Sequence, residues 1–194
     1  MESQYRLMYR LGLTPWDQDT IPTELTQMIE GAGAQPPGLA LDIGCGTGRH
    51  ADYMASRGWH VTAFDVSSRA IEEARRRRAD IDWHAVGLGA PSLDPVLGRL
   101  AGRVTLVLDI GCLHGLDTRG RAAWASTVNR VAAPGARLLL RAAPSRGTGF
   151  ITPRGIDPAE VSALLGPEWS RAGHPSHQWD VHVRSILGAP PFRC

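Results

Sequence analysis

Short, continuous apolar runs alternate along the chain with segments whose apolar residues recur every three or four positions. Continuous runs such as residues 39–43 and 104–108 are typical of strands buried on both faces, and the other pattern is typical of amphipathic helices. This alternation predicts an α/β fold with a parallel sheet. We expect strands over residues 39–43, 60–64, 81–86, 104–108, 136–141, 168–173 and 180–187, and helices over 23–29, 49–57, 68–78, 121–131 and 158–165.

The first predicted strand leads into a loop that holds Gly44, Gly46 and Gly48. Glycine adopts positive φ at little cost, and its missing Cβ lets backbone N–H groups approach a ligand. The pattern gives these glycines no packing purpose, and we therefore expect the loop to bind a ligand.

Two acidic residues flank this unit. Asp42 lies at the end of the first strand, and Asp65 ends the next strand, where a carboxylate can accept hydrogen bonds from both hydroxyls of a ribose. A dinucleotide-binding loop needs G-x-G-x-x-G, but here Arg49 takes the place of the third glycine. Asp42 would also repel a phosphate. The loop therefore favours a cationic, nucleoside-like ligand.

The stretches D-I-G-C-G-T-G-R (42–49) and F-D-V-S-S-R-A-I-E-E-A-R (64–75) together resemble the class I S-adenosylmethionine (SAM) dependent methyltransferases of the small-molecule type. The resemblance implies SAM as cofactor and S-adenosylhomocysteine (SAH) as its product. It implies a Rossmann-like, doubly wound sheet of seven strands over residues 35–190, mostly parallel with the last strand antiparallel and helices on both faces. Its glycine loop would contact the methionyl part, its first acid the amino end and its second acid the ribose. The residues that this assigns to the cofactor are Asp42, Gly44, Cys45, Gly46, Thr47, Gly48, Asp65 and Val66.

The end of the third predicted strand departs from that family. Related enzymes place an acid there to bind the adenine amino group, whereas this chain has Leu88 at the aligned position, between Gly87 and Gly89. The side-chain contact is therefore missing. We expect the backbone of Gly87 and Leu88 to meet the adenine edge instead.

The fourth predicted strand ends in D-I-G-C-L-H, residues 109–114, which resembles the small-molecule version of the loop beside the activated methyl group. The resemblance places Asp109 and Ile110 at the cofactor, and Asp109 and His114 are the candidate catalytic residues. His114 has two possible roles. It is a general base for an acceptor hydroxyl, thiol or amine, because its reference pKa is near neutral, or it is a residue that orders the loop.

The N-terminal segment 1–30 is rich in aromatic and apolar residues. It resembles the helical, Trp-containing segment that folds over the cofactor in thiopurine and tellurite-resistance methyltransferases, which makes Trp16 a candidate cofactor contact. The alternative is that Trp16 is an ordinary core aromatic residue. We expect one domain over residues 1–194.

Composition limits the partners. The formal net charge of +2 is too small for an electrostatic nucleic-acid footprint, although the pI is about 8.6. The arginines at 75–78 fit either a phosphate patch or, as we prefer, a helix end whose dipole favours positive charge. No apolar run approaches the ~20 residues that span a membrane, and three cysteines make a disulfide framework improbable. We expect a cytoplasmic protein without a bound metal.

These observations predict an enzyme that transfers methyl groups from SAM to a small molecule. Two alternatives stay open. One is a SAM-binding protein that does not methylate and uses the bound cofactor to assist another reaction, and the other is an RNA or protein methyltransferase. The second alternative calls for a basic groove or an added recognition domain, and the sequence indicates neither.

Overall fold

The computed structural model describes residues 11, 20–143, 155–176 and 179–185, with the backbone alone for residues 173–176. Its strands are β1 (Leu39–Ile43), β2 (His60–Asp65), β3 (Asp82–Ala85), β4 (Val104–Ile110), β5 (Ala132–Arg141), β6 (Trp169–Ser176) and β7 (Trp179–Arg184). Its helices are α2 (Thr23–Glu30), α3 (Arg49–Ser56), α4 (Ser68–Arg77), α5 (Asp94–Leu100), α6 (Thr118–Val131) and α7 (Pro158–Leu165), with 3₁₀ turns η1 (Pro91–Leu93) and η2 (Leu113–Gly115).

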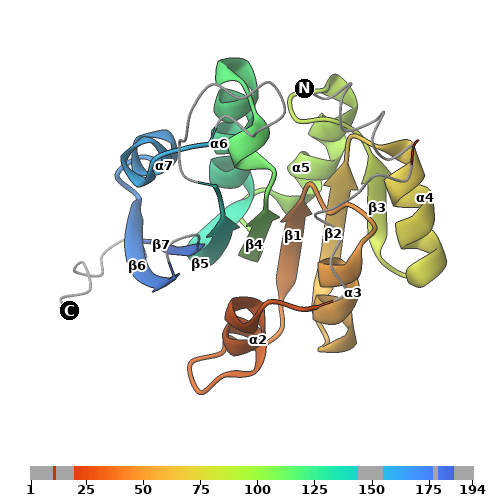
Figure 1. Cartoon of the computed structure of the whole chain (residues 1–194), viewed down its shortest axis with the longest axis horizontal. Helices are drawn as coiled ribbons and strands as arrows, with labels where there is room; N and C mark the ends of the chain where they lie inside the picture. Colours follow the sequence, from red (N-terminus) through yellow and green to blue (C-terminus); the bar gives the residue numbers. More distant parts are fainter. Residues whose placement is uncertain (1–10, 12–19, 144–154, 177–178, 186–194) are drawn as a thin grey trace.

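The strands of the described residues form one seven-stranded sheet in the order β3-β2-β1-β4-β5-β7-β6 (Figure 1). β1 pairs in parallel with both β2 and β4, and the pairs β2–β3 and β4–β5 are parallel too. β7, the last strand in sequence, lies antiparallel to β5 and β6. The predicted fold class, a Rossmann-like doubly wound sheet, is confirmed.

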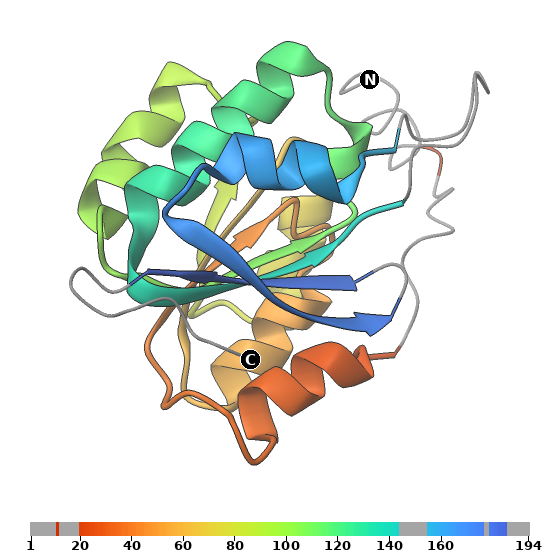
Figure 2. The same ribbon diagram turned by 90° about the vertical axis from the view of Figure 1, so that its left-hand side faces the viewer.

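Apolar side chains cover both faces of the sheet, because alternate residues of a strand point to opposite sides. Leu41 and Ile43 of β1 belong to a core cluster that includes the fully buried Trp124 of α6. Ala40, which precedes Leu41 and points to the opposite face of the sheet, belongs to a second cluster with residues of α2, α3 and α4. Figure 2 shows α6 and α7 on one side of the sheet and α2 and α3 on the other.

The helix α5 and the turn η1 before it escaped the sequence prediction. The helix is only seven residues long and carries Pro95 and Gly98, two poor helix formers. A signal was nevertheless present, because Leu93, Val96, Leu97 and Leu100 follow helical spacing and all four side chains are buried.

Helix α6 begins earlier than the sequence predicted. The Asp117 side chain caps it by accepting a hydrogen bond from the backbone N–H of Gly120 at 2.8 Å. The predicted hairpin also differs at its ends, since β6 continues to Ser176 and β7 starts at Trp179. The two residues between these strands lie outside the described residues.

Helix α2 falls inside the segment 1–30 that the sequence analysis assigned to a lid. Its Leu25, Met28 and Ile29 are buried in the core cluster on the α3 side of the sheet. Glu30 accepts hydrogen bonds from Tyr53 Oη and, at 2.9 Å, from Arg57 Nε on α3. This helix is therefore part of the packed core, and the proposed lid is confined to residues before it. Of these, residues 1–10 and 12–19, Trp16 included, lie outside the described part.

None of the helices in the described part of the chain is both long and apolar enough to cross a membrane.

Candidate functional site

The candidate site lies at the carboxyl ends of β1, β2 and β4. The chain proceeds from β1 to β2 on one side, whereas β4 and β5 continue on the other side of β1. Open α/β sheets bind their ligands at such a switch point, outside the carboxyl ends of the strands. The predicted site residues on the glycine loop, Asp65 and the loop after β4 are therefore brought to one edge of the sheet.

The glycine loop folds back over the end of β2. Its three glycines have φ of +71° (Gly44), +55° (Gly46) and +81° (Gly48), as the sequence predicted. The backbone N–H groups of Gly44 and Cys45 both donate to the carbonyl of Phe64, at 2.9 and 3.1 Å. The loop is thus fixed to β2 by main-chain hydrogen bonds before any ligand binds.

Gly44 and Gly48 also lie in close packing contacts, whereas the sequence predicted no packing role for the loop glycines. A Cβ on Gly48 would lie 2.4 Å from Trp83 Cη2 and 2.8 Å from Ala74 Cβ. A Cβ on Gly44 would lie 2.8 Å from Cys112 Cβ in the loop after β4. That inference was wrong because the contacts come from segments distant in sequence.

Asp65 is buried at the end of β2 and holds the glycine loop. Its Oδ2 accepts the N–H of Gly46 at 3.0 Å, and its Oδ1 accepts the N–H of Ser67 at 2.8 Å. Burial raises the pKa of Asp65, and these two hydrogen bonds act in the opposite direction. The carboxylate therefore already has the glycine loop and the start of α4 as partners.

Asp42 is the least satisfied polar group of the site. Its side chain is 2 % exposed, and its Oδ2 has no hydrogen-bond partner among the described residues. Burial, followed by the nearby charges of Asp109 and Asp65, raises the pKa of Asp42 to about 8. A buried acceptor atom of this kind is a place where a donor or cation from a ligand fits.

Asp109 organises the loop after β4. Its Oδ1 accepts the N–H of Cys112 at 2.8 Å, and its Oδ2 accepts the N–H of Leu113 at 3.1 Å and Nε1–H of Trp124 at 2.8 Å. The side chain is fully buried, and burial raises its pKa to about 7 against the opposing effect of these bonds. Sequence reasoning missed Trp124 as a partner, since its spacing indicated only a core residue.

His114 connects the loop after β4 to the end of β5. Its Nδ1 accepts the backbone N–H of Ala143 at 3.0 Å. A neutral imidazole that accepts at Nδ1 carries its proton on Nε2, so this hydrogen bond assigns the tautomer. Burial, then the charges of Arg141 and Arg121, lowers the pKa of His114 and favours this neutral form. Sequence reasoning found His114 but had no means of finding Ala143 or Arg141.

The predicted adenine side of the site lies at the ends of β2 and β3. The N–H of Val86 donates to the carbonyl of Asp65 at 2.9 Å, which keeps the two strand ends together. Val66 is half-buried there. Leu88 is half-buried too and packs against the core cluster that contains Trp124, while the carbonyl of Gly87 accepts a hydrogen bond from Ala90 at 3.3 Å.

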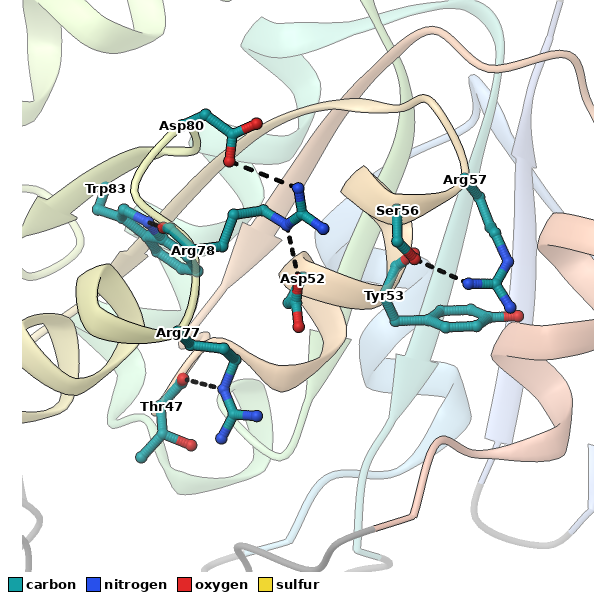
Figure 3. Close-up of polar contacts among 9 residues, drawn as sticks. All are labelled: Thr47, Asp52, Tyr53, Ser56, Arg57, Arg77, Arg78, Asp80 and Trp83. Carbon is teal, nitrogen blue, oxygen red and sulfur yellow. Dashed lines mark hydrogen bonds and ion pairs between the residues drawn. The ribbon is translucent and has the colours of Figure 1, made fainter.

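Three of the four arginines at 75–78 have structural partners, and Figure 3 shows two of them, Arg77 and Arg78. Arg77 Nε donates to the carbonyl of Thr47 in the glycine loop at 3.2 Å. Arg78 Nε donates to Asp52 of α3 at 2.6 Å, and Arg75 Nη2 donates to the carbonyl of Trp83 at 3.0 Å. These contacts brace the glycine loop, α3 and β3 against α4, which favours a structural role over a phosphate patch.

No cluster of three or more His, Cys, Asp or Glu side chains suited to a metal ion occurs within the described ranges.

Known methyltransferases resemble this chain in sequence. The family described as "Methyltransferase domain" matches residues 40–135. A probable thiol methyltransferase 2 of Arabidopsis thaliana is 27% identical over 159 residues, covering 82% of this chain and 70% of the relative. The 2-heptyl-1-hydroxyquinolin-4(1H)-one methyltransferase of Mycobacteroides abscessus is 27% identical over 126 residues, covering 65% of this chain and 54% of the relative.

Solved structures show the same fold. The N-methyltransferase NodS of Bradyrhizobium japonicum, in complex with SAH, superposes with a TM-score of 0.68 at 21% identity, covering 94% of this chain and 96% of that one.

Proposed function

The chain belongs to the class I SAM-dependent methyltransferases, and from this we propose that it methylates a small-molecule acceptor bound beside the carboxyl ends of β4 and β5. The observation that carries the proposal is the buried, unpartnered Oδ2 of Asp42 at the end of β1. It lies at the start of a loop whose three glycines have positive φ, a conformation that other residues adopt only at an energetic cost.

The residues present fit SAM as cofactor. SAM carries an ammonium group and a sulfonium group. The three buried acids Asp42, Asp65 and Asp109 lie at this edge of the sheet, where a bound cation would favour their ionised forms. We assign the amino end of the cofactor to Asp42 and the glycine loop, and the ribose to Asp65. Bound SAM supplies an electrophilic methyl group, and the chain's own residues align and shield it.

The finer assignments stay proposals. Gly44, Cys45, Gly46, Thr47 and Gly48 would line the methionyl part. Val66, Gly87 and Leu88 would border the adenine, and Asp109 and Ile110 the methyl end, with Trp16 in the proposed lid.

Asp109 and His114 are proposed as positioning residues. Asp109 is fully buried with its oxygens occupied by Cys112, Leu113 and Trp124, and it therefore fixes the loop rather than contacting an acceptor. His114 fixes the end of β5 through Ala143. Methyl transfer from a sulfonium then depends mainly on alignment within ~3 to 3.5 Å and on the exclusion of water.

A small-molecule acceptor is supported by the relatives, whose names specify a thiol and a hydroxyquinolone. The alternative of an RNA or protein methyltransferase gains no support from Arg75, Arg77 and Arg78, which are engaged in internal contacts. The other alternative, a protein that binds SAM without methylating, is favoured by the absence of an acid at Leu88. Mass spectrometry of candidate acceptors after incubation with SAM distinguishes this alternative from a methyltransferase, because only a methyltransferase adds a methyl group to the acceptor.

Replacing Asp65 with alanine is expected to weaken SAH binding by roughly 1.5–3 kcal/mol, which is the usual cost of losing hydrogen bonds to a charged group. The loss combines the ribose contacts with the hydrogen bond that holds Gly46. Titration calorimetry with SAH measures it, and Asp94→Ala, an exposed acid paired with Arg130, is the matched control. Unchanged affinity would refute the ribose assignment, and tighter binding of NAD than of SAH would refute the cofactor site.

A further inference from the structure

We infer that the acceptor is methylated as an anion, whose charge is held at the β4–β5 end of the site by Arg141 and by the Nε2–H of His114. The inference rests on the proposed function and narrows its acceptor to acidic groups that ionise near neutral pH, thiols first and acidic hydroxyls second. Amines and ordinary alcohols are excluded.

The charges around the site are distributed unequally. The cofactor side holds the three buried acids Asp42, Asp65 and Asp109, whose ionised forms a cationic cofactor would favour. On the acceptor side, Arg141 ends β5 and its guanidinium lies 5.7 Å from the centre of the Trp179 ring. Among the described residues no carboxylate forms an ion pair with Arg141. Its positive charge is therefore available to an anion, which fits an acceptor of opposite charge to the cofactor.

The other charged groups near His114 are already compensated. Arg121 pairs with Glu160 and donates to the carbonyls of Leu116 and Gly155, at 3.2 and 2.5 Å. Asp109, the acid of the same loop, lies below the surface with both oxygens accepting hydrogen bonds. Arg141 is thus the charge at this end that lacks a described counter-ion.

Neither candidate base has an atom free to take a proton. His114 Nδ1 is occupied by the N–H of Ala143, and the remaining ring nitrogen carries hydrogen and can only donate. Asp109 is fully buried. An acceptor that had to lose its proton during the reaction would find no base in these two residues, whereas an acceptor that arrives ionised needs none.

The chemistry balances without a proton transfer in the methylation step. The acceptor loses its proton to solvent before the methylation step, either in free solution or as it binds. A lone pair of the resulting anion then forms the new bond to the methyl carbon, and the carbon–sulfur bond breaks with its electron pair remaining on the sulfur of SAH. A cation and an anion become two neutral groups, a change that water exclusion favours.

The protonation state of a bound acceptor is measured directly with coloured probes. 4-Nitrothiophenol and 4-nitrophenol report their own ionisation by absorbance and are titrated in the SAH-bound protein, where no methyl transfer occurs. We expect the pKa of the bound probe to fall by at least ~1 relative to solution, as beside other fixed cations. Arg141→Gln should remove the shift, Arg141→Lys should retain part of it, and Arg99→Gln, at an exposed ion pair with Asp82, should leave it unchanged.

The same probes with SAM test the reaction. Across thiols and phenols of different acidity, the inflection in the pH profile should move with the acidity of the acceptor. An inflection fixed at one pH for all acceptors, and lost in His114→Gln, would overturn the inference, as would methylation of an aliphatic amine or alcohol. Preference between the thiol and phenol arms identifies the acceptor atom.

The tautomer of His114 provides a test that needs no acceptor. Nitrogen-15 NMR of the free protein should show a protonated Nε2 and an unprotonated Nδ1, and an unprotonated Nε2 would overturn the inference. Failure of the proposed function is distinguishable, because it would appear as absence of SAH binding by calorimetry. If SAH binds but the pKa of the bound probe is the same as in solution, only the inference of an anionic acceptor fails, and the proposed function stands.

Discussion

Gly48→Ala is expected to lower the free energy of unfolding by roughly 3 kcal/mol, because a positive φ costs a side chain about 1–2 kcal/mol and overpacking of a core adds about 1–3 kcal/mol. Gly48 has φ +81°, and its Cβ would overlap the Trp83 ring and Ala74. Neither neighbour can yield easily. The indole is 5% exposed and donates to the carbonyl of Arg78 at 2.8 Å, and Ala74 is fully buried on α4.

The matched control is Gly102→Ala. Gly102 has φ +66°, but a Cβ there meets nothing within 4 Å. Urea unfolding should therefore give about 1–2 kcal/mol of destabilisation at Gly102, from the backbone term alone. Equal losses at the two positions would mean that the contact with Trp83 carries no weight. A larger loss at Gly48 shows that the binding loop is part of the packing of α4 and β3.

Local pattern predicted the strands well because the central ones are buried on both faces. The boundaries of β1 and α3 follow from an apolar run, a glycine loop and a helix that ends near Gly58. The sequence did not predict helix α5, because Pro95 and Gly98 argued against a helix although the helical spacing of apolar residues was present. Sequence signals of this kind identify elements, but they say little about contacts between distant segments.

The same distinction between local pattern and long-range contacts applies to the residues of the site. The residue types of Asp42, Asp65 and the glycines carried the cofactor prediction, because their roles depend on one strand–loop–helix unit. The role of His114 stayed open at the sequence level, because it depends on the backbone N–H of Ala143, which lies 3.0 Å from Nδ1 across the fold. An N–H group has no sequence signature, and the tautomer was therefore accessible only from the structure.

Asp42→Asn is expected to stabilise the cofactor-free protein while weakening cofactor binding. The carboxyl group of Asp42 is buried without a partner for Oδ2, and its pKa is raised to about 8. The difference from an unfolded value near 3.9 is equivalent to roughly 5 kcal/mol when the carboxyl group is ionised at high pH. An amide carries no charge and avoids this cost. The residue is therefore retained for binding rather than for stability.

The sign of the pH dependence follows from the raised pKa. The folded protein holds the proton of Asp42 more tightly than the unfolded chain, and its contribution to stability is therefore complete below about pH 4. It is lost progressively as the pH rises from about 4 to about 8. Relative to the parent, the free energy of unfolding of Asp42→Asn should consequently rise little near pH 4. At pH 8 it should rise by on the order of 2 kcal/mol or more, after relaxation of the site.

Unfolding by urea between pH 4 and pH 8 measures the free energy of unfolding of Asp42→Asn and of the parent protein. Asp94→Asn is the exposed control, and its free energy of unfolding should stay close to that of the parent at every pH. Calorimetry with SAH gives the second half of the prediction. The cofactor's ammonium group replaces the proton on Asp42, so binding near pH 7 should release a proton, detected as a heat that varies with the ionisation enthalpy of the buffer. The release should vanish in Asp42→Asn together with most of the affinity. A stability difference that does not grow with pH would mean that Asp42 is ionised in the free protein, and the carboxylate would then need a counter-ion other than the cofactor.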